Sequence, residues 1–400
     1  TDMDLTDVHS ISTITPSVDA LGSLAAEIIR DTTGTGLNGR LAWDYTVPAS
    51  AVEYLAKDQI KVETFAFSVL DFQGGSVERT VTITITGTND TPTLTATDVG
   101  GVILEGTTLS DSGSIAFADL DLTDRPTATE VTKSVTALKA DGTTALTLTT
   151  DQQAAIEAAF SIAVPNPNTN ANNGTINWTY TITEANLNFL AKDEVVTAVF
   201  TVTVNDQNGG TAAQDVTVVL TGSNDVPTLT ANDVGGTILE GTTLSDSGSI
   251  AFADLDLTDR PTATEVTKSV TALKADGTTA LTLTTDQQAA IEAAFSIAVP
   301  NPNTNANNGT INWTYTITEA NLNFLAKDEV VTAVFTVTVN DQNGGTAAQD
   351  VTVVLTGSND VPTLTANDVG GTILEGTTLS DSGSIAFADL DLTDRPTATE

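Results

Sequence analysis

A six-residue motif rich in oxygen ligands recurs three times, and the rest of the chain is organised around it. The motif, called the joint here, reads Gly-Ser-Asn-Asp-Val-Pro at 222–227 and 357–362, and Gly-Thr-Asn-Asp-Thr-Pro at 87–92. Proline fixes φ and keeps the residue before it extended. Asn and Asp tolerate turn geometry and offer side-chain oxygens, which are the ligands that Ca²⁺ prefers. Each joint therefore predicts a short, stiff, acidic connection between two folded units, with a cation bound at it.

The charge balance of the whole chain is strongly acidic. Among 400 residues, 52 are acidic and 14 are basic, which gives a net charge of −38. Nucleic acid is excluded as a partner because its phosphates would be repelled. The acids are scattered among Thr, Ala and Gly, which indicates either a solubilising surface charge or sites for hard cations. The hydrophobic share of 40% is enough for buried cores.

Two further compositional features limit the class of protein. The chain has no cysteine, so it forms neither a disulfide framework nor a thiolate metal site. It has no apolar run of 18 residues, so we expect no transmembrane helix and no membrane insertion in this segment. The first residues lack a signal-peptide pattern, and both ends lie within the repeat pattern, so we expect a segment of a longer protein.

The joints belong to a repeat of 135 residues, the spacing from Pro92 to Pro227 and from Pro227 to Pro362. Trp43, Trp178 and Trp313 show the same spacing. The repeat predicts four parts. They are a repeat lacking its first strands at 1–90, two near-identical complete repeats at 91–225 and 226–360, and the opening strands of a further repeat at 361–400.

Within a repeat the dominant pattern is that of β-strands. Ile176, Trp178 and Tyr180 alternate with polar residues, as expected of half-buried antiparallel strands. A helical stretch at 151–160 interrupts them, with Thr150 or Asp151 as its N-cap. We therefore predict an all-β fold of tandem Greek-key β-sandwiches, cadherin-like or Ig-like, joined end to end by short acidic linkers. No function is assigned to the longer stretch that precedes Trp178 in the complete repeats.

Several ordered motifs resemble a known family. The strings at 174–180, 190–193, 204–210 and 222–227 are similar to the VCBS repeat of very large bacterial surface proteins, including RTX-type adhesins. The order of the motifs also resembles that of cadherin repeats. This resemblance implies a cadherin-like fold, export from the cell, and tandem repeats that extend an adhesive domain. Two departures are the length of the repeat and the absence of a Gly-Gly-x-Gly-x-Asp run, so the RTX calcium roll is missing.

The resemblance to cadherin joints also implies which residues would hold Ca²⁺. The upstream repeat gives an Asp after Ala-Lys and an Asp in the Gly-rich loop. The joint gives its Asn and Asp, and the downstream repeat gives a Glu after Leu and an Asp-Leu-Asp pair. The three sets are Asp58, Asp71, Asn89, Asp90, Glu105, Asp119 and Asp121; Asp193, Asp206, Asn224, Asp225, Glu240, Asp254 and Asp256; and Asp328, Asp341, Asn359, Asp360, Glu375, Asp389 and Asp391.

Other acids are less clear candidates. Asp124, Asp259 and Asp394 either join these sets or only cap a turn. Glu194 is a weaker candidate because Gln59 replaces it in the first repeat. The alternative interpretation is that all these acids are turn and surface residues of a solvated protein. Many carboxylates converging without a cation would repel one another, which favours the metal.

The sequence offers little for catalysis. The only histidine, His9, is interpreted as a solvated loop residue, and no Gly-x-Ser-x-Gly elbow or P-loop is present. Asp111-Ser112-Gly113 resembles an aspartic-protease triplet, but a β-turn is the favoured interpretation. The three tryptophans could be ligand platforms, although alternation places them in the core. We therefore expect no enzyme.

These observations lead to one main functional hypothesis and one alternative. The main hypothesis is a calcium-rigidified extender, or stalk, of a secreted bacterial cell-surface adhesin that serves attachment or biofilm formation. Its partners would be the neighbouring repeats of the same chain. The alternative is a structural subunit of an extracellular filament or sheath, in which copies of the chain associate laterally or by strand exchange. A glycan site in one repeat is disfavoured by the near-identity of 91–225 and 226–360.

Overall fold

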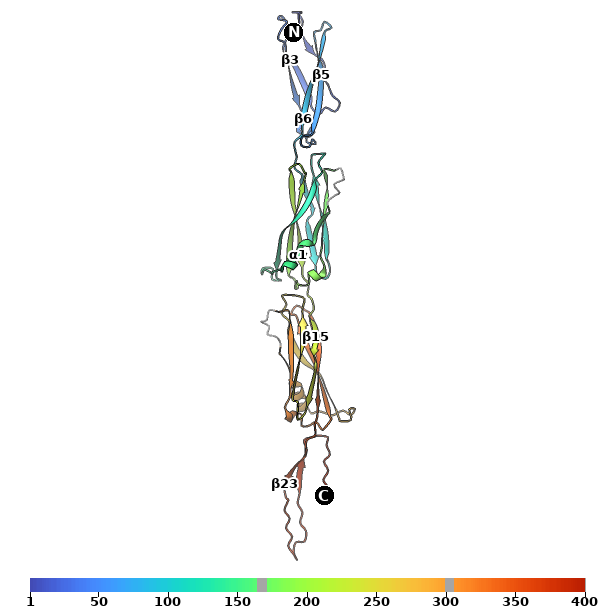
Figure 1. The fold of residues 1–400 in the computed structure, drawn as a ribbon, viewed down its shortest axis with the longest axis vertical. Helices are drawn as coiled ribbons and strands as arrows, with labels where there is room; N and C mark the ends of the chain where they lie inside the picture. Colours follow the sequence, from blue (N-terminus) through green and yellow to red (C-terminus); the bar gives the residue numbers. More distant parts are fainter. Residues whose placement is uncertain (164–170, 299–305, 400) are drawn as a thin grey trace. The chain divides into compact units, whose positions relative to one another are not determined.

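The structure, a computed structural model, describes residues 1–163, 171–298 and 306–399. The chain divides into two compact units. Unit 1 comprises Thr1–Leu138, Thr144–Asn186 and Val195–Leu220, and unit 2 comprises Lys139–Thr143, Leu187–Glu194 and Thr221–Glu400. Figure 1 shows the strands of each sandwich as two facing layers, which confirms the predicted tandem β-sandwich fold.

The first sandwich, in unit 1, has one sheet centred on a long strand and one two-stranded sheet. β5 (Ile60–Leu70) pairs antiparallel with β1 (Ser10–Ile11), β2 (Thr15–Pro16) and β6 (Ser76–Thr86). β3 (Ser23–Arg30) pairs antiparallel with β4 (Arg40–Thr46), and a 3₁₀ turn, η1, spans Ala49–Ala51. The small core consists of Leu24, Phe65 and Phe67, with Tyr45 packed against them.

The second sandwich has two four-stranded sheets. One has the order β11-β12-β9-β7, with β7 (Thr93–Asp98), β9 (Ser110–Ala118), β11 (Phe160–Ala163) and β12 (Asn173–Thr181). The other has the order β10-β13-β14-β8, with β8 (Gly100–Leu104), β10 (Thr127–Leu138), β13 (Val195–Asn205) and β14 (Thr211–Thr221). The helix α1 (Thr150–Ala158) and the 3₁₀ turn η2 (Glu184–Asn186) complete this part of the chain.

Unit 2 repeats this arrangement in the third sandwich. One sheet has the order β15-β17-β20-β19, with β15 (Thr228–Asp233), β17 (Ser245–Ala253), β19 (Phe295–Ala298) and β20 (Asn308–Thr316). The other has the order β16-β22-β21-β18, with β16 (Gly235–Leu239), β18 (Thr262–Leu273), β21 (Val330–Asn340) and β22 (Thr346–Thr356). It also contains α2 (Thr285–Ala293) and η3 (Glu319–Asn321), and a separate two-stranded sheet of β23 (Thr363–Ala366) and β24 (Ile385–Ala388) follows.

Alternation of side chains explains why these segments form sandwiches. In β13, Val196, Ala198, Phe200 and Val202 are fully buried, while the intervening residues, mostly threonines, lie on the other face. Branched side chains such as Thr and Val suit the pleated backbone, and a period of two places one face in the core. None of the described helices is long and apolar enough to cross a membrane.

The predicted helix is present but begins one residue earlier than expected. Its N-cap is Thr149, not Thr150 or Asp151. The Thr149 hydroxyl accepts the N–H of Gln152, and the Gln152 side chain accepts the N–H of Thr149. This reciprocal pair satisfies two backbone donors that the first turn would otherwise leave free. The prediction missed it because Thr149, Thr150 and Asp151 are all good caps.

Two interpretations of single residues need correction. Trp178 and Trp313 are fully buried as predicted, but Trp43 is 46% exposed. Trp178 is covered by β8 and β9, whose Gly101 and Gly113 lie against its ring, whereas Trp43 has no equivalent strands beside it in the described residues. The Asp111 triplet is not a turn, since it lies within β9.

Candidate metal centre

The candidate metal centre is formed at the turn that follows β9, where the acidic side chains are buried and the apolar side chains are exposed. Asp119, Asp121 and Asp124 are 5%, 0% and 3% exposed, whereas Leu120 and Leu122 are 56% and 55% exposed. The turn is held locally, because Oδ1 of Asp119 accepts the N–H of Asp121 at 3.0 Å. Carboxylates are normally solvated and rarely buried without a partner. This burial contradicts the interpretation of these three residues as solvated surface acids.

The three carboxylates converge and leave oxygens unused. Asp119, Asp121 and Asp124 each offer an oxygen, and these oxygens lie within 4.8 Å of one another. Oδ2 of Asp119, Oδ1 of Asp121 and Oδ2 of Asp124 are buried and have no hydrogen-bond partner. Buried polar atoms almost always have partners. Three such atoms in one cluster form a set of oxygen ligands of the kind that hard cations bind.

The joint contributes a fourth such oxygen. Nδ2 of Asn89 donates to Oδ2 of Asp206 at 2.8 Å, and Oδ1 of Asn89 is buried without a hydrogen-bond partner. The backbone N–H of Asp90 donates to Oδ2 of Asp121 at 2.9 Å. The joint is thus fixed by two residues of the second sandwich, and its amide oxygen completes a set of four oxygens.

A glycine-rich loop supports this set from the other side. Oδ1 of Asp206 accepts the N–H groups of Asn208, Gly209 and Gly210 at 2.7, 2.9 and 2.9 Å. A Cβ at Gly210 would lie 2.2 Å from Oδ2 of Asp206, so this close approach requires glycine. Nδ2 of Asn208 donates to Oδ1 of Asp124 at 2.9 Å, which orients the third carboxylate of the cluster.

Unit 2 contains the same centre, built by the next repeat. Asp254, Asp256 and Asp259 are 4%, 0% and 4% exposed, and their oxygens converge within 4.8 Å. Asn224 donates to Asp341 at 2.9 Å. The buried atoms without a hydrogen-bond partner again include one oxygen of each of these residues, namely Asn224 Oδ1, Asp254 Oδ2, Asp256 Oδ1 and Asp259 Oδ2.

A third cluster lies in unit 2 at the turn after β24. Asp389, Asp391 and Asp394 converge within 4.8 Å, and only Asp391 among them is fully buried. The N–H of Asp360 donates to Oδ2 of Asp391 at 2.9 Å. Glu240, which is 1% exposed, accepts the N–H of Ser358 at 2.8 Å. One oxygen each of Glu240, Asp360 and Asp391 is buried without a partner.

Burial and mutual repulsion shift the pKa values of these acids upward. Burial raises the pKa of Asp119 to about 6 and that of Asp254 to about 6, and the neighbouring carboxylates add to the effect. Burial, together with the charges of Asp259 and Asp254, raises the pKa of Asp256 to about 8. Burial likewise raises the pKa of Glu240 to about 7. Without a cation, Asp256 is therefore mainly protonated at neutral pH, whereas Asp119 and Asp254 carry charge at a cost in free energy.

The loop aspartates behave differently. Burial opposes ionisation of Asp206 and Asp341. However, hydrogen bonds from the joint asparagine and the loop N–H groups outweigh it, so the pKa of each lies below its ordinary value. Each centre thus combines one carboxylate that is held ionised with several that are destabilised when charged.

Some predicted residues lie outside these centres. Asp58, Asp193 and Asp328 are exposed and have φ values of 61°, 64° and 65°, so they are left-handed turn residues. The next residue is the buried one: Glu194 and Glu329 are 1% and 2% exposed. Glu375 is exposed as well, although Glu105 and Glu240 are buried.

Glu194, the weaker candidate of the sequence argument, is buried and hydrogen-bonded through both carboxylate oxygens. Its Oε2 accepts the N–H of Ala191 at 3.1 Å, and its Oε1 accepts the hydroxyl of Thr258 at 2.8 Å. Gln59 repeats the local part of this arrangement, since its Oε1 accepts the N–H of Ala56 at 3.1 Å. The change from Glu to Gln therefore keeps the hydrogen bond that holds this turn.

The structure also groups the predicted residues differently from the sequence argument. Asp206 was assigned to the joint that follows it, but it bonds Asn89 of the joint that precedes it. Glu240 was assigned to the joint before it, but it bonds Ser358 of the joint after it. The sandwich fold brings these pairs together across more than 100 residues, and no local pattern reveals that pairing.

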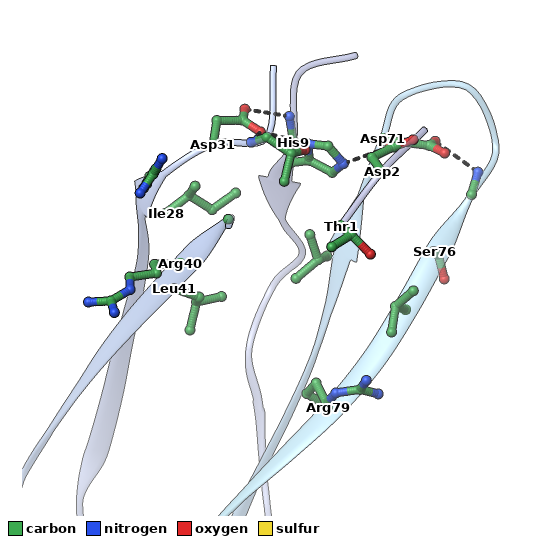
Figure 2. Close-up of a pocket in the computed structure, with 16 residues that line it drawn as sticks. Thr1, Asp2, His9, Ile28, Asp31, Arg40, Leu41, Asp71, Ser76 and Arg79 are labelled. Atoms are coloured by element: carbon green, nitrogen blue, oxygen red, sulfur yellow. Dashed lines mark hydrogen bonds and ion pairs between the residues drawn. The ribbon is translucent and has the colours of Figure 1, made fainter. Parts of the chain in front are cut away.

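In the first sandwich, Asp71 lies with Asp2 and Asp7, and their oxygens converge within 4.8 Å. Figure 2 shows Asp2 and Asp71 of this group together with His9, which lies between two carboxylates. Its Nδ1 is 2.7 Å from Oδ1 of Asp31 and its Nε2 is 3.0 Å from Oδ2 of Asp2. The hydrogen bond to Asp31 raises the pKa of His9. The interpretation of His9 as a solvated loop residue is therefore wrong.

Sequence reasoning missed or left open a few members of the centres. Asp124 and Asp259 belong to the buried clusters rather than only capping a turn. The recurrence of Asp-Leu-Thr-Asp at 4–7 and 121–124 was the available signal. Asn208 and Asn343, which orient those aspartates, gave no signal because Gln73 occupies the corresponding place in the first repeat.

Chemically, the centres in the described residues offer oxygen atoms only. Each complete centre presents at least four buried side-chain oxygens without hydrogen-bond partners, at least three of them from carboxylates. Hard cations with several oxygen ligands, above all Ca²⁺, suit such a set. Soft or imidazole-preferring metals do not, because the clusters contain neither sulfur nor histidine ligands.

Comparison with known proteins finds likeness only among solved structures. No family model and no curated protein matches the chain. The extracellular domain of protocadherin gamma B4 aligns at 12% identity over 94% of this chain and 50% of its own, with a TM-score of 0.36. Cadherin domains 1–5 of protocadherin gamma B2 align at 12% identity over 96% and 60%, with a TM-score of 0.38. The human desmocollin-1 ectodomain aligns at 14% identity over 86% and 56%, with a TM-score of 0.30. The chain thus spans 50–60% of these structures and is similar to tandem cadherin-domain ectodomains.

Proposed function

We propose that this chain is a calcium-rigidified extender of a secreted bacterial cell-surface adhesin, and that the buried aspartate clusters are its Ca²⁺ sites. The observation that carries the proposal is the set of four partnerless buried oxygens beside each complete cluster, Asn89 with Asp119, Asp121 and Asp124 being one set. Ca²⁺ takes six to eight oxygens, so backbone carbonyls, second carboxylate oxygens and water would supply the rest.

The mechanism of rigidification follows from which residues the ion would share. The joint asparagine and the Asp-Leu-Asp turn both supply oxygens, so a bound ion ties the linker to the sandwich that follows it. Without the ion, the charged carboxylates of the cluster repel one another. With it, repulsion becomes attraction, and the linker loses its freedom to swing. A row of such joints would hold an adhesive domain away from the cell surface.

Extracellular conditions suit this mechanism. Extracellular calcium modules work with dissociation constants of roughly 10⁻⁴ to 10⁻³ M, so sites of modest affinity are sufficient for this role. The resemblance of the sequence motifs to VCBS repeats of RTX-type adhesins supports attachment or biofilm formation as the setting. No step of this role requires catalysis.

Small-angle scattering of the chain with Ca²⁺ and then with excess chelator tests the proposal, together with a melting curve in each buffer. We expect Ca²⁺ to increase the maximum dimension and to raise the melting temperature. Mg²⁺ at the same concentration is the control for ionic strength. If neither the shape nor the melting temperature responds to Ca²⁺, the clusters do not rigidify the chain and the proposal is wrong.

A further inference from the structure

Asparagine followed by glycine occurs five times in the chain, and this dipeptide loses the side-chain amide of its asparagine most readily. The pairs lie at 38–39, 173–174, 208–209, 308–309 and 343–344. In the reaction, the backbone nitrogen of the glycine attacks the side-chain carbonyl carbon of the asparagine, and the missing Cβ of glycine leaves room for that approach. The pairs at 208–209 and 343–344 lie in the glycine-rich loops, where Asn208 and Asn343 each donate to a cluster aspartate.

The pairs at 173–174 and 308–309 are held within β-sheets. Asn173 and Gly174 belong to β12 and are opposite Ala118 and Phe117 of β9. The pair at 308–309 has the same register in β20, opposite residues 253 and 252 of β17. Ring closure at these pairs would take the glycine nitrogen out of its ladder, so it requires the sheet to open. Paired strands open at a higher free-energy cost than surface loops.

The loop pairs have only local hydrogen bonds to break. Asn208 and Gly209 lie between β13 and β14, and both are exposed. The N–H of Gly209 donates to Oδ1 of Asp206 at 2.9 Å. Nδ2 of Asn208 donates to Oδ1 of Asp124 at 2.9 Å. When these two bonds open, the glycine nitrogen can reach the side-chain carbonyl carbon of Asn208 without any change in the sheets.

We propose that Asn208 and Asn343 are deamidation sites, whose products place a further carboxylate against the metal centre. In the first step, the backbone nitrogen of the glycine loses its proton to a solvent base and bonds the side-chain carbonyl carbon of the asparagine. The bond from that carbon to Nδ2 breaks, and the amide nitrogen leaves as ammonia after taking up protons from water. Water then opens the cyclic imide and gives aspartate or isoaspartate. The net reaction consumes one water and releases one ammonia, so it needs no oxidant and no enzyme.

The product reverses the role of this side chain at the centre. Asp124 is 3% exposed, its Oδ1 accepts the amide of Asn208, and its Oδ2 has no hydrogen-bond partner. In unit 2, Asn343 donates to Oδ1 of Asp259 at 2.7 Å. A carboxylate in place of either amide removes the donor and adds like charge, so it destabilises the cation-free loop. A bound Ca²⁺ would accept the new oxygen as a ligand, and this part of the inference rests on the proposed function.

The first sandwich shows that the loop accepts a side chain that reacts far more slowly. Gln73 occupies the position of Asn208, and its longer side chain would have to close a larger ring. The backbone of the two loops is alike: Oδ1 of Asp71 accepts the N–H of Gln73 at 2.7 Å, as Oδ1 of Asp206 accepts that of Asn208. The double variant Asn208→Gln with Asn343→Gln therefore keeps an amide in each loop and blocks the reaction.

The first experiment follows deamidation of the 400-residue chain at pH 8 by peptide mass spectrometry, in the folded state and in urea. The two loops give identical peptides, and so do the two strand pairs, so loop is compared with strand. In the folded chain, we expect the loop peptide to convert at least about tenfold faster than the strand peptide. In urea, we expect similar rates. Equal rates in the folded chain, or a loop peptide that converts only in urea, overturns the proposal.

The second experiment measures what the modification does to the centre. The parent chain and the double glutamine variant are incubated until the loop peptide of the parent is converted, and both are then melted in chelator at pH 8. We expect the melting temperature of the parent to fall by several degrees relative to its own fresh sample, and that of the glutamine variant to stay unchanged. An incubated parent that melts like its fresh sample overturns the proposal.

A pair of charge variants supplies the matched control. Asn208→Asp with Asn343→Asp should reproduce the fall in melting temperature without incubation. Asn177→Asp with Asn312→Asp adds the same charge at exposed strand positions of β12 and β20 and should not. An equal fall in both double variants would show a general effect of charge and would overturn the assigned role of the loop positions.

Failure of this inference can be told apart from failure of the extender role. Conversion is measured by mass and stability is measured in chelator, so neither requires a bound cation. Deamidation in a chain that does not respond to Ca²⁺ would leave the modification sites standing and remove the extender. A calcium response in a chain whose loops do not convert would do the reverse.

Discussion

The side-chain amide of Asn89 donates a 2.8 Å hydrogen bond to Oδ2 of Asp206, which lies 117 residues further along the chain. Asn224 and Asp341 repeat the relationship at 2.9 Å. Because the amide nitrogen is used in this way, the amide oxygen of each asparagine remains without a hydrogen-bond partner beside three aspartates. One hydrogen bond thus ties the joint to the repeat that follows it and also sets the ligand that the joint offers.

Replacing this asparagine should cost stability at one joint and not at another. Asn224→Ala leaves the buried carboxylate of Asp341 without its side-chain donor, and hydrogen bonds to charged groups contribute about 1.5–3 kcal/mol. Asn359→Ala is the matched control, because Asn359 is exposed and donates only to the backbone oxygen of Asp360 among the bonds described. Hydrogen exchange of the 341–345 loop measures the effect, with the identical loop at 206–210 as an internal reference. Equal protection in both variants would contradict this account.

The stability of the cation-free protein should fall as pH rises. The pKa values of Asp254 and Asp256 are raised from 3.8 to about 6 and about 8 in the folded state. Between roughly pH 4 and 8, the native state therefore binds more protons than the unfolded chain, and its stability decreases as those protons leave. In chelator, we expect a melting temperature several degrees lower at pH 8 than at pH 5. Saturating Ca²⁺ should abolish that difference, because the ion takes over the role of the protons. A melting temperature that rises from pH 5 to pH 8 in chelator would contradict the predicted sign.

Much of this architecture could be predicted from local sequence. Strand alternation and the spacing of Pro92, Pro227 and Pro362 were sufficient for the tandem sandwiches, because a period of two and a long repeat are visible without knowing any contact. The Asp-Leu-Asp turns were recognised for the same reason, since their residues are neighbours in the chain.

The assignment of ligands to joints could not be predicted in this way. It depends on which end of a sandwich each loop reaches, and that is set by strand order. Asp206 lies next to Asn89 only because β13 and β14 meet at the end of the sandwich where the chain enters. The exposure of Asp193 beside the buried Glu194 was also hidden, because it results from a left-handed turn at Asp193.

A change at Asp256 should have opposite effects with and without calcium. Asp256→Asn removes a buried charge that its neighbours destabilise, so in chelator at pH 8 the variant should be at least as stable as the parent. In Ca²⁺ it lacks a carboxylate ligand, and we expect the affinity of that centre to fall by at least about tenfold, equivalent to about 1.4 kcal/mol. Calorimetric titration measures the calcium affinity, and melting curves in both buffers measure the stability.

The control for this change is a residue that the sequence analysis predicted to be a calcium ligand. Asp328→Asn alters an exposed turn residue that the structure leaves outside the clusters. The calcium affinity of the Asp328→Asn variant should stay within about twofold of that of the parent chain. A loss at Asp328 as large as that at Asp256 would show that the centre extends beyond the buried cluster.

The buried glutamate that follows this turn should tolerate glutamine but not alanine. Glu329 accepts the N–H of Ala326 at 3.1 Å and the hydroxyl of Thr393 at 2.8 Å. Glutamine keeps the first bond through its carbonyl oxygen, as Gln59 does with Ala56, and its amide can donate to the threonine hydroxyl. Glu329→Gln should therefore leave the melting temperature in chelator within about 2 °C of the parent. Glu329→Ala leaves a buried N–H without its acceptor, at a cost of about 1–3 kcal/mol, and should lower the melting temperature by several degrees. If glutamine proved as damaging as alanine, the negative charge of Glu329 would itself be required, and the residue would belong among the cation ligands.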